Sequence, residues 1–252
     1  HLWYVGGGLH PISQGADLTA CSAHKTLPVL TGGAWLNIRE ARYSHGAKEA
    51  MALFGSTSPS YPIMASLDLC RAWLQEEGTA SFGRLEQVVS GLKELARGKG
   101  IAQPLGPCDP IRLAFNTASM GTPGEEAAQW LRERGIEPEY ADGGHVVMIL
   151  TPMNTQEEIR RLREAIAAFP MKSPLALPSA LPPQPERAAS PREAVLAPSE
   201  WVPVDRAAGR IAAQAACPCP PGVPVVMPGE RIAENTVEFL ISYRISRIKV
   251  IK

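Results

Sequence analysis

Ser22-Ala23-His24-Lys25-Thr26-Leu27 is the most informative stretch of this sequence, because it places a lysine beside an imidazole and two hydroxyls, directly after an apolar run. A lysine amine attacks a carbonyl only in its neutral form, so such a site must disfavour the ammonium through partial burial or a nearby cation. Lys25 is therefore a candidate for a Schiff base with pyridoxal phosphate. The alternative is a solvated surface lysine, the commonest state of this residue type.

Two buried strands are predicted on either side of the lysine. The first covers 16–21 and leads into the motif, and the second covers 34–38 and follows the Thr31-Gly32-Gly33 turn. Lys25 is therefore expected on a connection between strands.

Two amphipathic helices are predicted next. Apolar residues recur at mostly helical spacing over 62–76, where Gly78 is expected to end the helix, and again over 82–96, where Gly98 is expected to end it. Such stripes are more typical of a buried core face than of a functional surface.

Residues 111–169 follow the order strand, helix, strand, helix, which predicts a small α/β unit. Thr122-Pro123-Gly124-Glu125 and Thr155-Gln156-Glu157-Glu158 both resemble capping boxes, in which a hydroxyl and a carboxylate three residues apart bind N-terminal N–H groups. Gly135 is expected to stop the first helix, and 146–150 to form a short apolar strand.

Prolines crowd into residues 170–198, which predicts an extended linker, because proline fixes φ and removes a backbone donor. Beyond the linker, the chain ends in alternating Ile, Arg and Lys. This tail predicts a strand with one face in water.

Composition narrows the class of protein. The 252 residues carry 25 Lys and Arg and 25 Asp and Glu, so no overall field favours nucleic acid or an anionic membrane. No apolar run reaches the ~18 residues that cross a bilayer, and we expect a soluble, cytoplasmic protein. The five cysteines are scattered and odd in number, which argues against a disulfide framework. Cys217-Pro218-Cys219 has no second Cys or His pair nearby, so no metal site is expected.

The sequence opens at His1 on an apolar, aromatic segment without an initiating methionine. We expect that it begins inside a domain, and that strands needed to cover its apolar faces lie upstream.

Three separated motifs point to one family. In order they are Ser22-Ala23-His24-Lys25-Thr26-Leu27-Pro28 followed by Leu30-Thr31, then Ser56-Thr57-Ser58-Pro59-Ser60-Tyr61, and then Pro220-Pro221-Gly222-Val223-Pro224 with Pro228-Gly229-Glu230. Together they resemble the Orn/Lys/Arg decarboxylase family over nearly the whole chain. The short proportions are similar to those of its bacterial branch without an N-terminal wing domain.

The resemblance implies an α/β fold and a division of the chain. It implies the C-terminal part of a fold-type-I transferase large domain, a small α/β domain and a C-terminal α+β domain. The expected ranges are 1–98 for the partial cofactor-binding large domain, 99–170 for the small domain, 171–198 for the linker and 199–252 for the C-terminal decarboxylase domain.

It also implies the roles of the site residues. Lys25 would hold pyridoxal 5'-phosphate as an imine, and Ser22 and His24 would contact the cofactor phosphate. Ser56 and Thr57 would reach the phosphate of the neighbouring subunit, so the active site would require a homodimer or a higher homo-oligomer. Glu230 would pair with the distal cation of a basic amino-acid substrate, although a solvated turn carboxylate is an equal reading.

The implied activity is decarboxylation of lysine, arginine or ornithine in polyamine metabolism. One departure stands against it, because no residue of this chain matches the family's aspartate that pairs with the pyridine nitrogen. Two alternatives stay open: a pyridoxal-phosphate-dependent aminotransferase, since the lysine alone does not choose the bond that breaks, and a non-catalytic fragment that assembles with a partner.

Overall fold

The computed structural model describes five ranges of the chain, namely 10–104, 108–175, 184–217, 224–243 and 245–252. The chain divides into two compact units. One comprises His1–Ala114 and Val147–Phe169, and the other comprises Phe115–Val146 and Pro170–Lys252. Of the predicted features, the segment at His1, part of the proline-rich linker and most of the Pro220-Pro221-Gly222-Val223-Pro224 motif lie outside the described residues.

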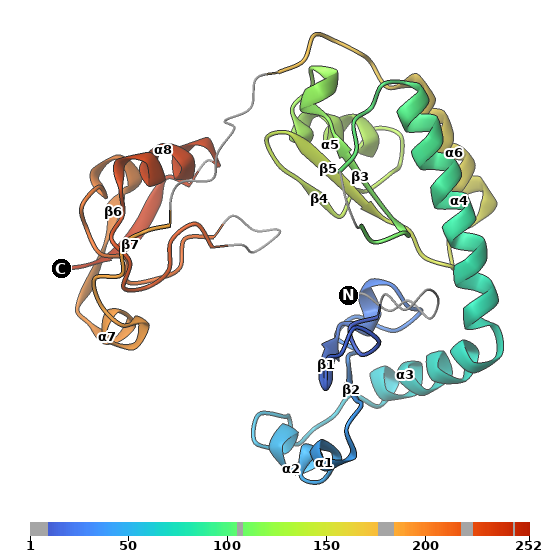
Figure 1. Ribbon diagram of the computed structural model, residues 1–252, viewed down its shortest axis with the longest axis horizontal. Helices are drawn as coiled ribbons and strands as arrows, with labels where there is room; N and C mark the ends of the chain where they lie inside the picture. The colour runs from blue at the N-terminus through green and yellow to red at the C-terminus, as the bar shows by residue number, and fades with distance from the viewer. Residues whose placement is uncertain (1–9, 105–107, 176–183, 218–223, 244) are drawn as a thin grey trace. The chain divides into compact units, whose positions relative to one another are not determined.

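Two antiparallel strands carry the lysine motif between them (Figure 1). They are β1 (Leu18–Cys21) and β2 (Trp35–Ile38), and Leu18 lies opposite Ile38. The two predicted strands are confirmed, but the prediction that both are buried is wrong, since Leu18 is 41% exposed and Leu36 is 38% exposed. Each strand of a two-stranded ribbon has only one neighbouring strand, so little of the surface of the ribbon is buried.

Helices fill the rest of the first part of the chain. Two short helices, α1 (Ala41–Ser44) and α2 (Ala47–Ala52), precede α3 (Tyr61–Trp73). A π-helical segment, η2 (Leu74–Gly78), then joins α3 directly to α4 (Thr79–Gly98).

The prediction that Gly78 ends a helix is wrong. Gly78 has φ −54° and ψ −49°, which are ordinary helical values, and it is buried. A Cβ at this position would lie 2.9 Å from Cδ2 of Leu74, so the glycine accommodates a close side chain inside the helical run. Glycine is a helix stop only when its backbone turns left-handed, and here the backbone does not.

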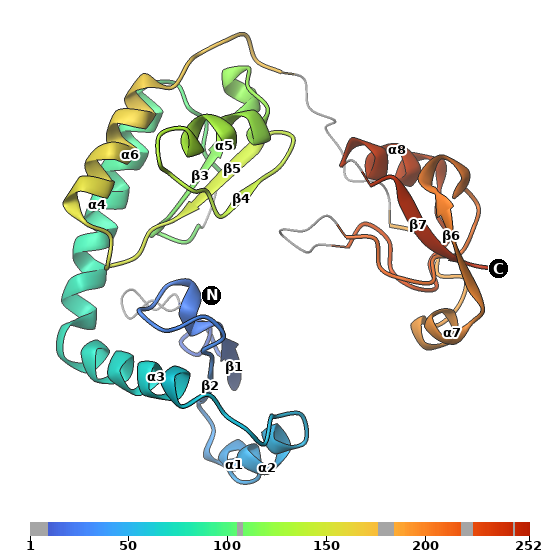
Figure 2. The ribbon, with the colours of Figure 1, turned by 180° about the vertical axis from the view of Figure 1, so that it is seen from behind.

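The predicted amphipathic face of α4 is confirmed, and it packs on α6 (Gln156–Ala168). Figures 1 and 2 show these two helices side by side. Lys99, just past the end of α4, donates from Nζ to the carbonyl oxygens of Ala167 and Phe169. The buried residues of α4 are Ser81, Phe82, Leu85, Val89, Leu92 and Ala96.

The strand, helix, strand, helix order predicted for 111–169 is confirmed. Strands β3 (Arg112–Asn116), β5 (His145–Ile149) and β4 (Tyr140–Ala141) form one sheet in the order β3-β5-β4. Helix α5 (Gly124–Arg132) lies between β3 and β4 in the chain, and Gly135 follows it with a left-handed φ of 69°.

One of the two predicted capping boxes is confirmed and the other is wrong. At α6, Thr155 and Glu158 bind each other's backbone N–H groups. At α5 the N-cap is Pro123, and the Thr122 hydroxyl is buried without a hydrogen-bond partner. The reason is Gly124, where a Cβ would collide with the carbonyl oxygens of Asp142 and His145; this close approach fixes the start of the helix instead.

The C-terminal part contains α7 (Pro191–Leu196), β6 (Ser199–Pro203), the 3₁₀ turn η4 (Val204–Arg206), α8 (Glu234–Ser242) and β7 (Arg247–Ile251). Strands β6 and β7 pair antiparallel. The predicted one-sided tail strand is confirmed, because Ile248 and Val250 are buried while Arg247 is exposed. The core residues here are Val204, Ala207, Ala212, Ala216, Val226, Ile232, Val237, Leu240, Ile248 and Val250.

Among the helices of the described ranges, none is both long and apolar enough to span a lipid bilayer.

Candidate active site

The lysine lies on a single 3₁₀ turn, η1 (Ala23–Lys25), which Ser22 separates from the end of β1. The turn is closed by hydrogen bonds from Lys25 N to Ser22 O at 3.3 Å and from Leu27 N to Ala23 O at 2.9 Å. Ala23 and Leu27 are buried beneath it, at 2% and 4% exposure, whereas Ser22, His24 and Lys25 are half-buried. The turn thus brings the three predicted residues together, each of them partly accessible to solvent.

His24 is fixed by the backbone of the next turn. The Gly33 carbonyl oxygen accepts two hydrogen bonds from His24, one from the backbone N–H at 3.3 Å and one from ring Nδ1 at 3.0 Å. The imidazole therefore has a defined orientation before any ligand binds.

The loop from Lys25 to β2 is anchored on helix α3. Leu30 donates its N–H to Oγ of Ser66 at 3.1 Å, and this hydroxyl donates in turn to the Ile63 carbonyl at 2.8 Å. Leu67 of the same helix lies beside Gly33, where a Cβ would come within 3.4 Å of its Cδ2. Helix α3 therefore positions the loop that holds His24.

A small polar cluster lies on the ribbon just before the motif. Asn37 on β2 donates from Nδ2 to Oγ1 of Thr19 at 3.2 Å and to Sγ of Cys21 at 3.3 Å, both on β1. Cys21 is buried and adjoins Ser22. The cluster fixes the end of β1, and hence the start of the lysine turn.

Ser56 and Thr57 lie in a separate exposed turn between α2 and α3. The hydrogen bonds described for this turn are local: Ser58 N donates to Ser56 Oγ at 3.1 Å, and Ser56 Oγ donates to Ser58 O at 3.4 Å. The next helix, α3, starts after Ser60, which caps it without a side-chain hydrogen bond. The hydroxyls of this turn therefore face solvent in the single chain.

Glu230 belongs to the other compact unit and has a local contact of its own. Its Oε2 accepts from the Met227 N–H at 2.7 Å, and its backbone N–H donates to the Met227 carbonyl at 3.1 Å. These bonds close a turn that contains Gly229, whose φ is 90°. One carboxylate oxygen of Glu230 therefore stabilises this turn.

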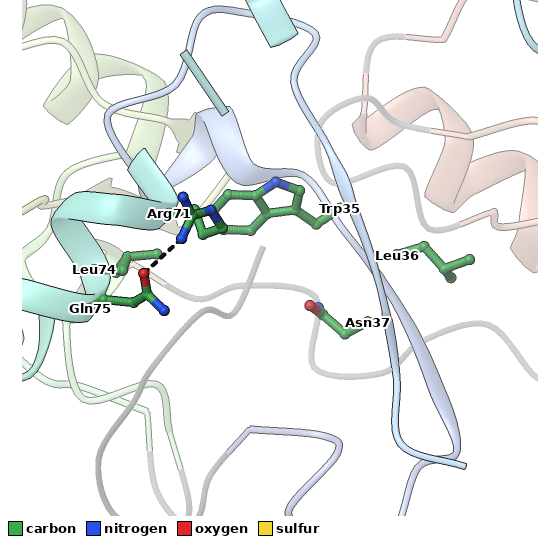
Figure 3. Close-up of a pocket in the computed structure, with 6 residues that line it drawn as sticks. All are labelled: Trp35, Leu36, Asn37, Arg71, Leu74 and Gln75. Carbon is green, nitrogen blue, oxygen red and sulfur yellow. Dashed lines mark hydrogen bonds between the residues drawn. The ribbon is translucent and has the colours of Figure 1, made fainter. Parts of the chain in front are cut away.

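A groove of about 370 Å³ opens beside strand β2 (Figure 3). Arg71 in it donates from Nη1 to Oε1 of Gln75 at 2.6 Å, and also pairs with Asp68. Among the described residues, the lining is made by Trp35, Leu36, Asn37, Arg71, Leu74 and Gln75. None of the predicted site residues is in that set, so the groove and the lysine turn are different features.

Sequence reasoning gave no role to Asp142 and favoured a structural role for His145, and the structure shows what Asp142 does. Asp142 accepts hydrogen bonds from the Tyr140 hydroxyl and from the N–H groups of Gly144 and His145. Burial opposes ionisation of Asp142, but these hydrogen bonds and the nearby His145 outweigh it and lower the pKa of the carboxyl. Burial and the bond to Asp142 raise the pKa of Tyr140. The group holds a turn together, and its only sequence signal was the close spacing of polar residues.

Gly33 is the other residue that sequence reasoning missed. The Gly32-Gly33 pair signalled a turn, but the double hydrogen bond from His24 to a backbone carbonyl leaves no mark in side-chain patterns. Only the folded loop shows that Gly33 orients the histidine.

Solved structures share the fold of this chain. The chain has the mixed α/β fold of bacterial lysine decarboxylases: the constitutive enzyme of E. coli aligns with a TM-score of 0.72 and that of Francisella novicida with 0.74, each at 19% identity over 93% of this chain and 49% of the other.

The chain belongs to the Orn/Lys/Arg decarboxylase family. The family's major-domain model matches residues 13–101, and its C-terminal-domain model matches residues 177–247. A relative named arginine decarboxylase, from Bacillus subtilis, is 31% identical over 250 residues, which is 92% of this chain and 51% of the relative. The lysine decarboxylase LdcA of Pseudomonas aeruginosa is 48% identical over 60 residues, covering 22% of this chain and 8% of its own. Most of this chain aligns with curated relatives such as the B. subtilis protein, and it spans about half of their length.

Proposed function

We propose that the whole protein is a pyridoxal-phosphate-dependent decarboxylase that converts lysine, arginine or ornithine to the corresponding amine and carbon dioxide. The observation that carries the proposal is Lys25, which lies half-buried at the end of η1, directly after His24 and three residues after Ser22, in a chain of this family. Its relatives named arginine and lysine decarboxylase support a basic amino acid as the substrate.

The residues on η1 suit this cofactor. Lys25 supplies a primary amine, the group that combines with a carbonyl carbon when it is neutral. The Ser22 hydroxyl has no hydrogen-bond partner within the described ranges, so it is available to donate to a phosphate oxygen. Ring Nε2 of His24 remains for a phosphate oxygen, because Nδ1 is hydrogen-bonded to the Gly33 carbonyl oxygen.

The reaction replaces one group at the substrate Cα. The bond from Cα to the carboxylate carbon breaks, carbon dioxide leaves, and a proton takes its place at Cα. Pyridoxal phosphate, when bound, supplies a conjugated ring that accepts the electron pair left at Cα. In this chain Lys25 would hold the cofactor and release it to the incoming amino acid, while Ser22 and His24 would keep its phosphate in place.

Finer assignments follow from the family resemblance. They include the fold-type-I large domain, the four ranges 1–98, 99–170, 171–198 and 199–252, and a homodimer in which Ser56 and Thr57 face the partner's cofactor phosphate. They also include pairing of Glu230 with the distal cation of the substrate, and a cytoplasmic role in polyamine metabolism. The exposed hydroxyl turn at Ser56 supports the dimer proposal, because its donors face outward.

The test is carbon dioxide release by the protein at the full length that its gene encodes, supplied with pyridoxal phosphate and one basic amino acid at a time. We expect release with at least one of lysine, arginine and ornithine, and its loss in Lys25→Ala. Lys48→Ala on α2 is the matched control, since Lys48 is an exposed lysine outside the site. No release with any of the three would contradict the proposal, and formation of a keto acid instead would favour an aminotransferase.

A further inference from the structure

The hydrogen bond between His24 and Gly33 fixes the tautomer of the imidazole. The Gly33 carbonyl oxygen can only accept, so His24 Nδ1, at 3.0 Å, must carry a hydrogen. In the neutral ring Nε2 then has no hydrogen and is an acceptor. Phosphate oxygens are acceptors too, so a neutral His24 has no hydrogen to give them.

We infer that Gly33 is a positioning residue which makes His24 take up a proton when a phosphate monoester binds. The inference rests on the proposed function, because it assumes that the cofactor phosphate lies at His24. As an imidazolium, His24 donates from Nδ1 to Gly33 and from Nε2 to the phosphate, and this charge-assisted bond is stronger than a neutral one. The site therefore selects the phosphate ester over the free alcohol, and it does so more strongly at lower pH.

The fold leaves Gly33 little freedom to release Nδ1. Gly33 is buried, and a Cβ there would overlap Val29 and would come within 3.2 Å of the Leu30 carbonyl oxygen. Its N–H donates to that same Leu30 carbonyl at 3.0 Å. The carbonyl that selects the tautomer is thus held by a closely packed loop that is tied to α3 through Ser66.

Among the described residues, the groups around His24 and Gly33 come from their own segment and from α3. The titratable groups beside the imidazole on its own segment are Lys25 on η1 and Cys21 at the end of β1. From α3, the residues beside Gly32 and Gly33 are apolar, namely Ile63 and Leu67. Lys25 would also exchange protons if it combined with the cofactor carbonyl, with loss of water, so its contribution must be separated from that of His24 by a ligand that has the carbonyl but no phosphate.

Pyridoxal is that ligand. At about pH 8 a phosphate monoester is already a dianion, because its second pKa is about 6, and an ordinary histidine is neutral. The proton balance of binding is measured by titration calorimetry of the full-length protein in two buffers with different ionisation enthalpies. We expect the binding of pyridoxal phosphate to take up about one more proton than the binding of pyridoxal. The affinity for pyridoxal phosphate should therefore fall about tenfold more than the affinity for pyridoxal for each unit by which the pH rises.

The variant His24→Gln separates a protonation role from a structural one. A glutamine amide donates a hydrogen bond without taking up a proton, so we expect binding of pyridoxal phosphate to persist while the extra proton uptake disappears. His45→Gln is the control, because His45 is an exposed histidine after α1. In Gly33→Ala, the affinity for pyridoxal phosphate should fall more than that for pyridoxal, whereas a purely structural defect would lower both equally.

Covalent trapping keeps the two proposals apart. Borohydride reduction followed by peptide mass spectrometry reports whether the cofactor attaches to Lys25, whatever the state of His24. Attachment with equal proton uptake for both ligands, or with the extra proton retained in His24→Gln, would overturn the inference and leave the proposed function standing. Failure to attach at Lys25 would overturn both.

Discussion

The Tyr140 hydroxyl donates to Oδ2 of Asp142 at 2.5 Å, while Oδ1 of the same carboxylate accepts from the N–H groups of Gly144 and His145 at 2.8 and 2.7 Å. Both oxygens of one anion are therefore occupied by donors from β4, from β5 and from the turn between them. Because the side chain of Asp142 is only 16% exposed, these bonds form where water competes weakly.

This contact predicts a specific sensitivity to acid. The pKa of Asp142 lies below its ordinary value of 3.8, so its ionised form stabilises the folded state above that pH, and this contribution is lost as the pH falls through the folded pKa. We expect Asp142→Asn to cost roughly 1–3 kcal/mol at neutral pH. Thermal unfolding between neutral pH and about pH 3 should then show a shallower acid loss in the variant; parallel curves would contradict the assignment.

Gly124 should tolerate no side chain. A Cβ there would collide with the carbonyl oxygens of Asp142 and His145, so Gly124→Ala should destabilise the fold by roughly 1–3 kcal/mol through overpacking. Gly83→Ala is the matched control, because no atom lies within 4 Å of its Cβ position and it is inside α4. It should stabilise by about 0.5–1 kcal/mol. Denaturant titration of both variants measures the contrast, and equal effects would refute it.

Helix α7 should depend on its capping box. Ser190 accepts from the Glu193 N–H at 3.2 Å, and the Glu193 carboxylate binds the Ser190 N–H at 2.9 Å. We expect Ser190→Ala to cost about 1 kcal/mol of stability in denaturant unfolding. Ser90→Ala on the exposed side of α4 should cost nothing. An equal loss in the two variants would argue against the cap.

The cysteines should differ sharply in reactivity. Burial raises the pKa of the Cys70 thiol to about 11, and Cys70 is only 2% exposed, so little thiolate forms at neutral pH. Cys108 is exposed. Iodoacetamide labelling of the native protein, followed by peptide mass spectrometry, should modify Cys108 well before Cys70. Unfolding the protein in denaturant should remove the difference, and comparable native rates would contradict this prediction.

How far the sequence could predict the fold is clear from the helix termini. Thr155, Thr122 and Ser190 each stand three residues before a glutamate, yet only Thr155 and Ser190 form capping boxes. The pattern at Thr122 fails because Gly124 packs against the backbone of a strand that is distant in sequence. Local patterns cannot report such contacts.

The part of the candidate site that could be predicted consists of residues that are neighbours in the sequence. The part that could not be predicted consists of partners that are distant in the sequence. Ser22, His24 and Lys25 are adjacent in sequence, so one short turn brings them together. The partner of His24 is a backbone carbonyl nine residues away, which has no sequence signature. Ser56 and Glu230 belong to other turns, and their proposed roles depend on contacts beyond this single chain.

The π-helical segment η2 has a consequence for how insertions and deletions are tolerated. Residues after an added helical position are rotated by about 100° relative to those before it, since an α-helix has 3.6 residues per turn. Leu74–Gly78 therefore sets the rotation of the apolar face of α4 relative to that of α3, across the bend at which the two helices meet (Figures 1 and 2). Removing a single residue from η2 would rotate Phe82 and Leu85 out of the core. The helical hydrogen bonds could still form, so the length of η2 matters more than its composition.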